Sequence, residues 1–465
     1  MTAMAPDPHD PTGMHTPAGD LARAVARLAG LAEQRLVTPP ALGSAPSPTE
    51  LAAAAGPTVT AAGLGVDEAL RLWREVLDPA CMSVDHPRFF AFIPGAATQM
   101  SAAFDMLLST SSVYGGSWLE GAGAAFAENQ ALRWIADLAG LPATAGGSFV
   151  QGGTIGNLSA LVAARERARA VRPVTPHRWA VCVTEETHSS VGHSLRTVMD
   201  CDLIVVPGDA RGRMTGELLR ETVSRCTEEQ RAGIFAVVAT AGSTNLGMVD
   251  DLAGIGAFAR ANGWWLHVDG AYGGAGLAVP ELREIYRGIE DADSFIVDPH
   301  KWLMGPFDCC ALLYRDPAIG RAAHTQHADY LDAVNLDGDW NPSDFAIQLT
   351  RRARGLPLWF SLAVHGTDAY REAIARTVAV THAGADLVRA AEHLDLLVDP
   401  ELSVLVFARR GWSADDYTQW SARLLRDQIA FVTPTRHRGQ VCTRICVVNP
   451  LTTVDDLAVI VDSMR

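Results

Sequence analysis

The stretch 264–307, which reads WWLHVDGAYGG…DSFIVDPHKWLMGPF, decides the fold and the chemistry of this chain. It contains two apolar runs of strand length, LHV and FIV. The first run ends at Asp269, and the second leads through DPH to Lys301. In an open α/β sheet, ligands bind outside the carboxyl ends of the strands. We therefore expect Asp269 and Lys301 to lie together at that edge of a sheet.

A carboxylate and an amine at one such edge suit pyridoxal phosphate. This cofactor needs a partner for its pyridinium nitrogen and a lysine that forms an imine with it. Imine formation needs a partly neutral amine, and we expect burial to lower the pKa of Lys301. Two plainer alternatives stay open. Lys301 could extend outward into solvent, and Asp269 could cap the turn that begins at Gly270.

Composition and charge limit the class of protein and its partners. Of the 465 residues, 48% are hydrophobic and 20% are charged, which is typical of a globular enzyme. The net charge of −15 disfavours nucleic acid or an anionic membrane surface as a partner. No apolar run is long enough for a spanning helix, and the N-terminus lacks the pattern of a secretory signal. Eight scattered cysteines without a CxxC pair predict reduced thiols in a cytoplasmic protein, and no metal site is expected.

The composition along the chain predicts four parts. Residues 1–18 are rich in Pro, Asp, His and Gly and are expected to be disordered. Residues 19–85 are expected to form a helical arm that packs on a partner subunit, with its helices separated by a linker that runs to about Pro57. Residues 86–355 are expected to form a large cofactor-binding domain, and residues 356–465 a small C-terminal α/β domain that begins with a long helix.

Strands and helices alternate through the large domain. This alternation predicts a mostly parallel, doubly wound sheet in an α/β fold. Helices are expected between successive strands, for example at residues 215–225 and 252–261. The predicted strands of this sheet are 179–183, 203–206, 234–239, 266–268, 295–297 and 310–314.

A glycine-rich turn at residues 146–157 precedes a helical pattern. Such a turn leaves backbone N–H groups free to bind an anion, and the helix dipole assists. Thr154 can add a hydroxyl donor. Simple turn chemistry is the alternative, because the spacing matches neither the dinucleotide fingerprint nor the P-loop.

Two further side chains follow predicted strands. His188 comes after the strand at 179–183, where an imidazole could stack on the cofactor ring or serve only as a helix cap. Thr244 follows the strand at 234–239 and could also reach the cofactor.

Together these residues resemble the group II pyridoxal-phosphate-dependent amino-acid decarboxylases, in particular the aromatic-L-amino-acid branch. The matching segments run in family order from about residue 66 to the end of the chain. The resemblance implies an aspartate-aminotransferase-like fold, pyridoxal 5′-phosphate as the cofactor and an amino acid as the substrate. The matching segments are HPRFFAF, ENQALRW, QGGTIGNLSALVAAR, THSS, ATAGSTN, HVDGAYGG, ADSFIVDPHKWL, FDCCALLYR and RRARGLPLWF.

The resemblance implies a role for each matching residue around the cofactor ring. Lys301 forms the imine, and Asp269 pairs with the pyridinium nitrogen. His188 stacks on one face of the ring, and Ala271 packs against the other.

The phosphate is implied to lie at the glycine-rich turn. Gly153 and Thr154 hold it, with help from Asp298 or His300. An ionised Asp298 beside a phosphate would be repulsive, so orienting a neighbour or carrying a proton is the alternative role for this carboxyl.

Residues 323–337 resemble the mobile catalytic loop, which reaches into the neighbouring subunit's site. Tyr330 resembles the loop tyrosine that returns a proton to Cα after CO₂ leaves. His324 and His327 compete for this role because imidazole titrates near neutral pH. A loop that acts on the partner's site implies a homodimer with active sites at the subunit interface.

The substrate residues are implied less directly. Phe92, Pro94, Gly95 and Trp118 resemble a substrate wall. Gly116 stands where aromatic-specific enzymes of the family have a bulkier residue, so a larger pocket is one expectation.

An aromatic L-amino acid is the expected substrate, with acidic or aliphatic amino acids as alternatives. The expected products are the amine and CO₂. Oxidative deamination to an aldehyde is the alternative outcome, associated in the family with loss of the loop tyrosine or of the stacking histidine. Both Tyr330 and His188 are present, which favours the amine.

Overall fold

The computed structural model describes Met14, residues 21–331 and residues 340–465, and the chain divides into two units, Met1–His86 and Pro87–Arg465. Most of residues 1–18, which we expected to be disordered, lie outside the described residues. So does the end of the predicted catalytic loop. Within the described part of the chain, no helix is long and apolar enough to cross a membrane.

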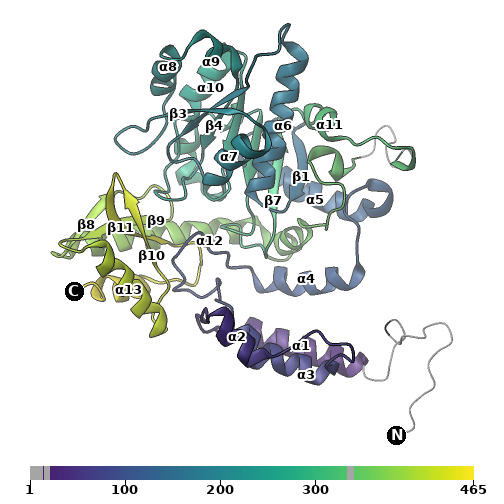
Figure 1. Ribbon diagram of the computed structural model, residues 1–465, viewed down its shortest axis with the longest axis vertical. Helices are drawn as coiled ribbons and strands as arrows, with labels where there is room; N and C mark the ends of the chain where they lie inside the picture. The colour runs from purple at the N-terminus through teal and green to yellow at the C-terminus, as the bar shows by residue number, and fades with distance from the viewer. Residues whose placement is uncertain (1–13, 15–20, 332–339) are drawn as a thin grey trace. The chain divides into compact units, whose positions relative to one another are not determined.

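The first unit is helical, as predicted (Figure 1). Arg35 at the end of α1 holds Asp85 through two hydrogen bonds of 3.0 and 2.7 Å, which fastens the end of the unit to its first helix. Its α-helices are α1 (Leu21–Val37), α2 (Pro48–Ala55) and α3 (Gly65–Leu72), and α3 continues as a π-helical turn (Trp73–Leu77) and a 3-10 turn (Asp78–Ala80).

Helix α2 corrects the prediction of a linker up to residue 57. Ser47 accepts a hydrogen bond from the backbone of Glu50, and the Glu50 side chain accepts one from the backbone of Ser47. This reciprocal pair is a capping box, and Pro48 stands at the first helical position, where its missing N–H costs nothing. The sequence SPTE therefore starts a helix in a segment whose composition resembles a linker.

The second unit is built on a seven-stranded sheet with the order β1-β7-β6-β5-β4-β2-β3 (Figure 1). β7 runs antiparallel to both of its neighbours, and the strands from β6 to β3 pair in parallel. The predicted mostly parallel α/β sheet is confirmed. The strands are β1 (Gly146–Val150), β2 (Ala180–Thr184), β3 (Asp202–Val206), β4 (Ile234–Thr240), β5 (Trp265–Asp269), β6 (Ser294–Val297) and β7 (Cys310–Tyr314).

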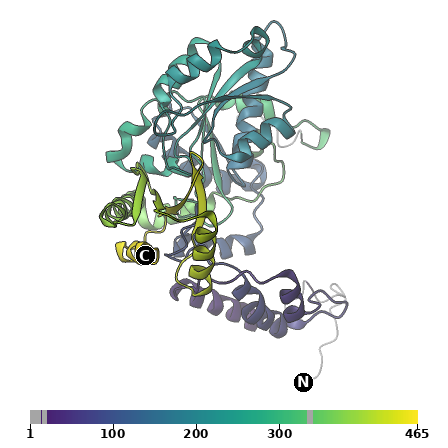
Figure 2. The same ribbon diagram turned by 60° about the vertical axis from the view of Figure 1, so that its left-hand side comes forward.

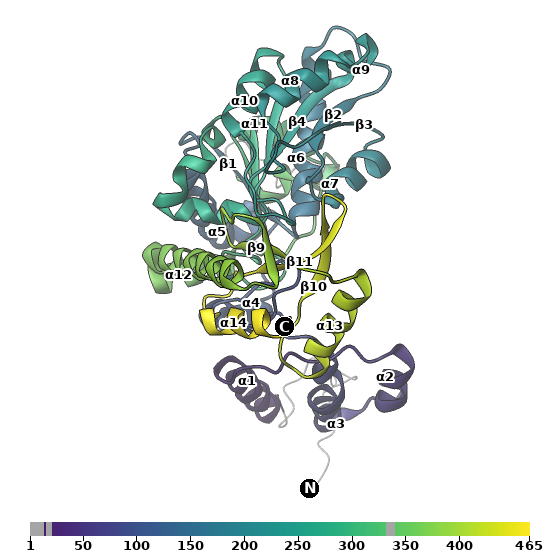
Figure 3. The same cartoon turned by 90° about the vertical axis from the view of Figure 1, so that its left-hand side faces the viewer.

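Helices cover both faces of this sheet (Figure 3). Apolar residues of α6 and alternate residues of the strands form one core cluster, whereas α5, α8 and α10 pack on the opposite face in another. The helices of this part of the unit are α4 (Gln99–Ser111), α5 (Trp118–Leu138), α6 (Gly153–Val171), α7 (Ser189–His193), α8 (Gly216–Ser224), α9 (Glu228–Gly233), α10 (Leu252–Ala261) and α11 (Pro317–His324).

Strand β1 was not predicted, because its glycines were assigned to a turn. The strand pairs antiparallel with β7 over its whole length, and all five of its residues are buried. A Cβ at Gly147 would collide with the carbonyl oxygen of Leu312 on β7. Glycine is required there by close approach of two backbones, which weakens the usual strand signal.

The C-terminal part contains a second, antiparallel sheet with the order β10-β11-β9-β8, drawn in yellow-green beside the large sheet in Figure 2. Strand β8 was not predicted. Phe90, which the predicted boundary assigns to the large domain, packs in the core of this part, and its N–H donates to the carbonyl oxygen of Phe431 at 2.8 Å. The elements are α12 (Leu356–Ala390), β8 (Leu394–Val398), β9 (Val404–Arg409), α13 (Ala414–Arg426), β10 (Thr433–His437), β11 (Gln440–Cys446) and α14 (Val454–Asp462).

Candidate active site

A cavity of about 290 Å³ lies at the carboxyl ends of the strands of the large sheet. The loops that follow strands β2, β4, β5 and β6, together with the N-terminal part of α6, supply most of its wall. This is the edge at which ligands bind in doubly wound sheets. All of the predicted cofactor-binding residues line the cavity: Gly153, Thr154, His188, Thr244, Asp269, Ala271, Asp298, His300 and Lys301.

The Asp269 carboxylate is buried and held at both oxygens. Oδ1 accepts the backbone N–H of Ala271 at 3.0 Å, which is the turn-capping role that we considered as an alternative. Oδ2 accepts the Nδ2 amide of Asn157 at 2.9 Å. Each oxygen keeps a second lone pair, so the carboxylate can accept one more donor from the cavity.

Lys301 does not extend into solvent but forms an ion pair inside the cavity, with Nζ 3.0 Å from Oδ2 of Asp298. Burial alone would lower the pKa of Lys301, but the charges of Asp298 and Asp269 and the hydrogen bond to Asp298 outweigh it and raise the pKa. Our expectation of a lowered pKa was therefore wrong. The expectation considered only desolvation and left out the charge of Asp298, three residues earlier in the chain.

Two buried polar atoms on the cavity wall have no hydrogen-bond partner among the described residues. They are Oδ1 of Asp298 and Oγ1 of Thr240. Buried polar atoms are almost always paired in folded proteins. Their presence around one cavity fits a bound polar group that completes their hydrogen bonding.

The N-terminus of α6 forms one end of the cavity. Gly153 donates its backbone N–H to Oδ2 of Asp298 at 3.3 Å, so this carboxylate already lies at an anion-binding position. His300 lies nearby, with Nε2 3.7 Å from the same oxygen and Nδ1 2.7 Å from the carbonyl oxygen of Cys309. Burial lowers the pKa of His300 despite the neighbouring Asp298 charge.

His188 lines the cavity and also caps helix α7. Its Nδ1 accepts the backbone N–H of Ser190 at 3.3 Å and lies 2.8 Å from the Ser190 hydroxyl. Because Nδ1 accepts, the neutral ring carries its proton on Nε2. The capping role that we weighed against ring stacking is thus present, and it fixes the orientation of the imidazole.

The predicted substrate residues do not line this cavity within one chain. Phe92 is 61% exposed, and the main chain of Gly95 packs against the carbonyl oxygen of His300, so that a Cβ would collide with it. The ring of Tyr114 fills the space in which a side chain at position 116 would stand, so Gly116 does not enlarge a pocket here. Pro94 is buried, and Trp118 begins helix α5, where its N–H donates to Oδ1 of Asn341 at 2.9 Å.

Tyr330 lies in a 3-10 turn (Asp329–Leu331), but its side chain is outside the described residues. Its competitor His324 is buried on α11, where Nε2 lies 3.0 Å from the carbonyl oxygen of Ser159. This contact occupies the imidazole within the core of the unit, away from the cavity lining.

Several residues of the cavity were not predicted. Asn157 stands one helical turn after Gly153 on α6, so the helical period alone places both toward the same side. Glu186 precedes His188 by two positions in the same loop. Neither residue belongs to a pattern that marks a site by itself, so sequence reasoning passed over them. The additional lining residues are Gly152, Asn157, Glu186, Ser190, Thr240, Gly242 and Tyr272.

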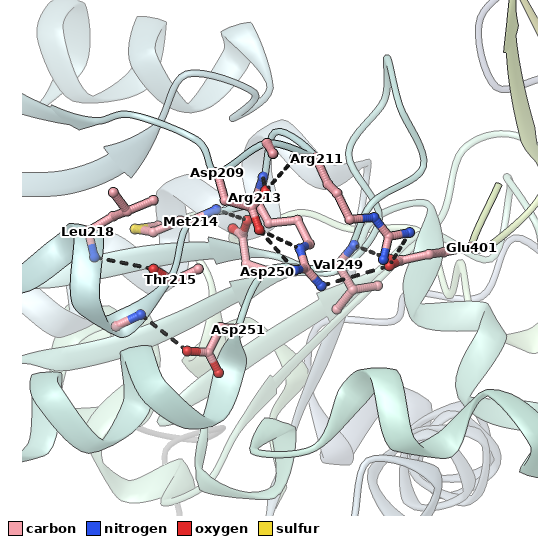
Figure 4. Close-up of polar contacts among 12 residues, drawn as sticks. Asp209, Arg211, Arg213, Met214, Thr215, Leu218, Val249, Asp250, Asp251 and Glu401 are labelled. Atoms are coloured by element: carbon pink, nitrogen blue, oxygen red, sulfur yellow. Dashed lines mark hydrogen bonds and ion pairs between the residues drawn. The ribbon is translucent and has the colours of Figure 1, made fainter. Parts of the chain in front are cut away.

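A polar cluster supports the end of β4 next to the cavity (Figure 4). Asp250 accepts the N–H groups of Thr240 at 2.8 Å and of Met214 at 2.7 Å. Burial raises the pKa of this fully enclosed carboxyl to about 7. Beside it, Glu401 pairs with Arg211 at 2.8 Å and accepts the N–H of Val249 at 3.3 Å. These bonds fasten the loop that carries Gly242 and Thr244.

Comparison with known proteins identifies the family. Residues 49–410 match the pyridoxal-dependent decarboxylase conserved domain. The chain is 34% identical over 413 residues to the L-2,4-diaminobutyrate decarboxylase of Rhizobium meliloti (strain 1021), across 86% of this chain and 82% of that protein. It is 29% identical over 387 residues to the aromatic-L-amino-acid decarboxylase of Bacillus atrophaeus, across 80% and 79% of the two chains. The structure of Oryza sativa TDC with PLP and tryptamine matches with a TM-score of 0.85 at 25% identity, across 97% and 98% of the two chains.

The match to a decarboxylase domain over more than three hundred residues agrees with what the cavity presents. The expected group II family, fold and cofactor are confirmed by these relatives. The chain belongs to the pyridoxal-dependent decarboxylases, and the protein is a pyridoxal-phosphate-dependent carboxy-lyase that acts on amino acids.

Proposed function

We propose that the protein decarboxylates an aromatic L-amino acid to the corresponding amine and CO₂. The observation that carries this proposal is that Asp269, Lys301 and the N-terminus of α6 line one cavity. They match the ring nitrogen, the imine-forming aldehyde and the phosphate of pyridoxal phosphate, respectively. The Bacillus relative and the rice structure, whose names specify aromatic amino acids and tryptamine, support the aromatic class.

When bound, pyridoxal phosphate would supply an electron-withdrawing ring that could take up the electron pair left on Cα by the departing CO₂. In this proposal, Asp269 accepts a hydrogen bond from the ring nitrogen and keeps it protonated. Lys301 attaches the cofactor through its amine. Gly153 and Thr154 bind the phosphate with backbone and hydroxyl donors, assisted by the helix dipole.

Four other residues shape the space around the ring. His188 stacks on one face of the ring, with its orientation fixed by Ser190, and the Ala271 methyl group covers the other face. Thr244 and His300 supply further polar groups to the cavity wall, which also holds the unpaired Oγ1 of Thr240. Together these residues would orient the substrate so that its carboxylate-bearing bond stands perpendicular to the ring, the orientation in which the electrons of that bond can enter the ring.

Tyr330 is proposed as the acid that returns a proton to Cα, which yields the amine. This role needs the loop to cover the site, and the proposed loop acts on the partner subunit of a homodimer. Several large apolar side chains on α4 and α5 are exposed in the single chain, and a subunit interface over these helices would bury them. They include Leu107 at 60%, Leu119 at 63% and Phe126 at 58% exposure. In such a dimer, Phe92, Pro94, Gly95, Gly116 and Trp118 are proposed to complete the substrate site.

A second candidate substrate is an amino acid with a cationic side chain. Glu186 lines the cavity, and it has no hydrogen bond or ion pair within the described part of the chain. Burial and the charge of Glu185 raise the pKa of Glu186, so a nearby cation would stabilise its ionised form. The 34% identity to a diaminobutyrate decarboxylase is consistent with this candidate.

One experiment separates these substrates and the two possible products. The purified protein with pyridoxal phosphate is incubated with single amino acids, and CO₂, amine, aldehyde and O₂ uptake are measured. Turnover of aromatic amino acids to amines without O₂ uptake supports the proposal. Aldehyde with O₂ uptake selects oxidative deamination. Turnover of a diamino acid that Glu186→Gln abolishes selects the second candidate.

A further inference from the structure

A row of buried hydrogen bonds runs behind the Asp269 carboxylate, on the sheet face that α6 covers. Asn157 Nδ2 lies 2.9 Å from Asp269 Oδ2, and Asn157 Oδ1 lies 2.6 Å from His267 Nε2. His267 Nδ1 lies 2.8 Å from the Ser294 hydroxyl, which accepts the indole N–H of Trp265 at 2.7 Å. Each of these five side chains is at most 5% exposed.

The strand register explains why these side chains meet. Trp265, His267 and Asp269 alternate along β5 and therefore point to one face. Ser294 stands opposite His267 in the pairing of β5 with β6. Asn157 projects from α6 onto that face, one turn after the predicted phosphate-binding Gly153. The row thus follows from the alternation of side chains along β5 and from the helical repeat of α6, which places Asn157 on the same side as Gly153.

The direction of every hydrogen bond in the row is determined. The Trp265 indole can only donate to the Ser294 hydroxyl, which keeps its own proton and a second lone pair. At the other end, Asp269 Oδ2 accepts a hydrogen bond from the NH₂ group of Asn157. Asn157 Oδ1 then faces His267 Nε2, which must carry the proton. A neutral imidazole with its proton on Nε2 accepts at Nδ1, so the Ser294 hydroxyl donates to it and the donors of the row point toward Asp269.

We propose that Asn157 and His267 are positioning residues that hold the Asp269 carboxylate aimed at the ring nitrogen of the cofactor, a role that rests on the proposed function. Asn157 supplies the donor that stabilises the carboxylate, and His267 locks the Asn157 amide in the required orientation. Burial lowers the pKa of His267 even though Asp269 is close, so the imidazole stays neutral and does not add a competing cation. Without the Asn157 donor, Asp269 Oδ2 loses the contact that fixes its direction, so the carboxylate no longer holds the proton of the ring nitrogen as firmly.

The test measures the protonation of the ring nitrogen directly. Holoenzymes are reconstituted with pyridoxal phosphate that carries ¹⁵N in the ring, and their ¹⁵N NMR shift is recorded. We expect a protonated nitrogen in the wild type and an unprotonated one in Asn157→Leu. The kcat of this variant should fall about ten- to hundredfold, the usual cost of removing a residue that orients an active-site group, with KM nearly unchanged. His267→Gln and Ser294→Ala, which keep more of the packing, should shift the signal in the same direction.

The matched control is Ser463→Ala. Ser463 accepts the indole N–H of Trp420 at 2.9 Å, as Ser294 does for Trp265, but it lies outside the cavity. This control should lose a comparable hydrogen bond and keep the protonated ring nitrogen. If the ring nitrogen stays protonated in Asn157→Leu, His267→Gln and Ser294→Ala but loses its proton in Asp269→Ala, the positioning role is overturned. A protonated nitrogen in Asp269→Ala would instead overturn the proposed role of Asp269, and the positioning role with it.

Discussion

Oδ2 of Asp298 lies 3.0 Å from Nζ of Lys301 and accepts the N–H of Gly153 at the start of α6. The buried carboxylate thus joins the cofactor-attaching amine to the proposed phosphate site. Before the cofactor binds, the charge of the Lys301 ammonium offsets that of this carboxylate. This pairing also means that the amine is held in its protonated form until the cofactor arrives.

Replacing Asp298 with Asn should make cofactor attachment easier at lower pH. The pKa of Lys301 is raised because the Asp298 and Asp269 charges outweigh burial. Without the Asp298 charge, burial dominates and the pKa of Lys301 falls, so more neutral amine is present at a given pH. The pH profile of the visible absorption band, recorded as pyridoxal phosphate is added to the apoprotein, checks this shift. Asp291→Asn on the surface is the control, and an unchanged profile in Asp298→Asn would refute the account.

Replacing Tyr330 with Phe should lower amine formation by about 10²- to 10⁴-fold, the usual contribution of a positioned acid. CO₂ release should persist better than amine release, because the proton is needed only after CO₂ has left. Aldehyde and O₂ uptake should rise in turn, as the family resemblance implies. Product analysis of the variant checks this outcome. Amine formation at the wild-type rate would assign the proton to another group, with His327 as the next candidate.

The stability of the fold should depend on pH through Asp250. Its folded-state pKa is raised by burial to about 7, so the folded state binds this proton more tightly than the unfolded chain does. The stabilisation is complete below the ordinary pKa of an aspartic acid and is lost as pH rises through about 7. From about pH 5 to about pH 7 the loss should be on the order of 2 kcal/mol. Urea unfolding at several pH values should show this fall in the free energy of unfolding in the wild type. An equally large fall in Asp250→Asn would contradict the assignment to Asp250.

Removing Arg351 should destabilise the second unit strongly. Its guanidinium is fully buried and forms two hydrogen bonds of 2.8 Å with the Glu128 carboxylate, which also accepts the N–H of Gly355 at 2.8 Å. Arg351→Met leaves Glu128 charged and buried without its partner, at a cost of about 3–5 kcal/mol. Denaturant unfolding checks this value. Arg410→Met, which removes the exposed pair with Asp395, is the matched control and should change stability little.

Most of the candidate site could be predicted because its residues lie at or just after the carboxyl ends of buried strands. Asp269, Lys301 and His188 each follow an apolar run, and the sheet brings these run ends to one edge. The elements that were missed had misleading compositions. Gly147 lies in a strand because two backbones approach closely there, and Ser47 starts a helix within a proline-rich segment.

Other features depend on the three-dimensional placement of side chains, which residue type alone does not encode. The raised pKa of Lys301 reflects the position of Asp298 relative to the amine, which depends on the turn between them. The row behind Asp269 requires α6 to lie over β5, so that Asn157 reaches His267. The space beside Gly116 is filled by the ring of Tyr114, a local packing detail that residue type alone does not specify.

The central claim is that Lys301 and Asp269 support decarboxylation of an aromatic L-amino acid. The most direct measurement is the release of CO₂ and amine from purified holoenzyme given single carboxyl-labelled amino acids, with Lys301→Ala measured in parallel. We predict equal amounts of CO₂ and amine from an aromatic amino acid, and neither product from Lys301→Ala, which should also lack the visible absorption band. No CO₂ from any amino acid, or unchanged release by Lys301→Ala, would contradict the account.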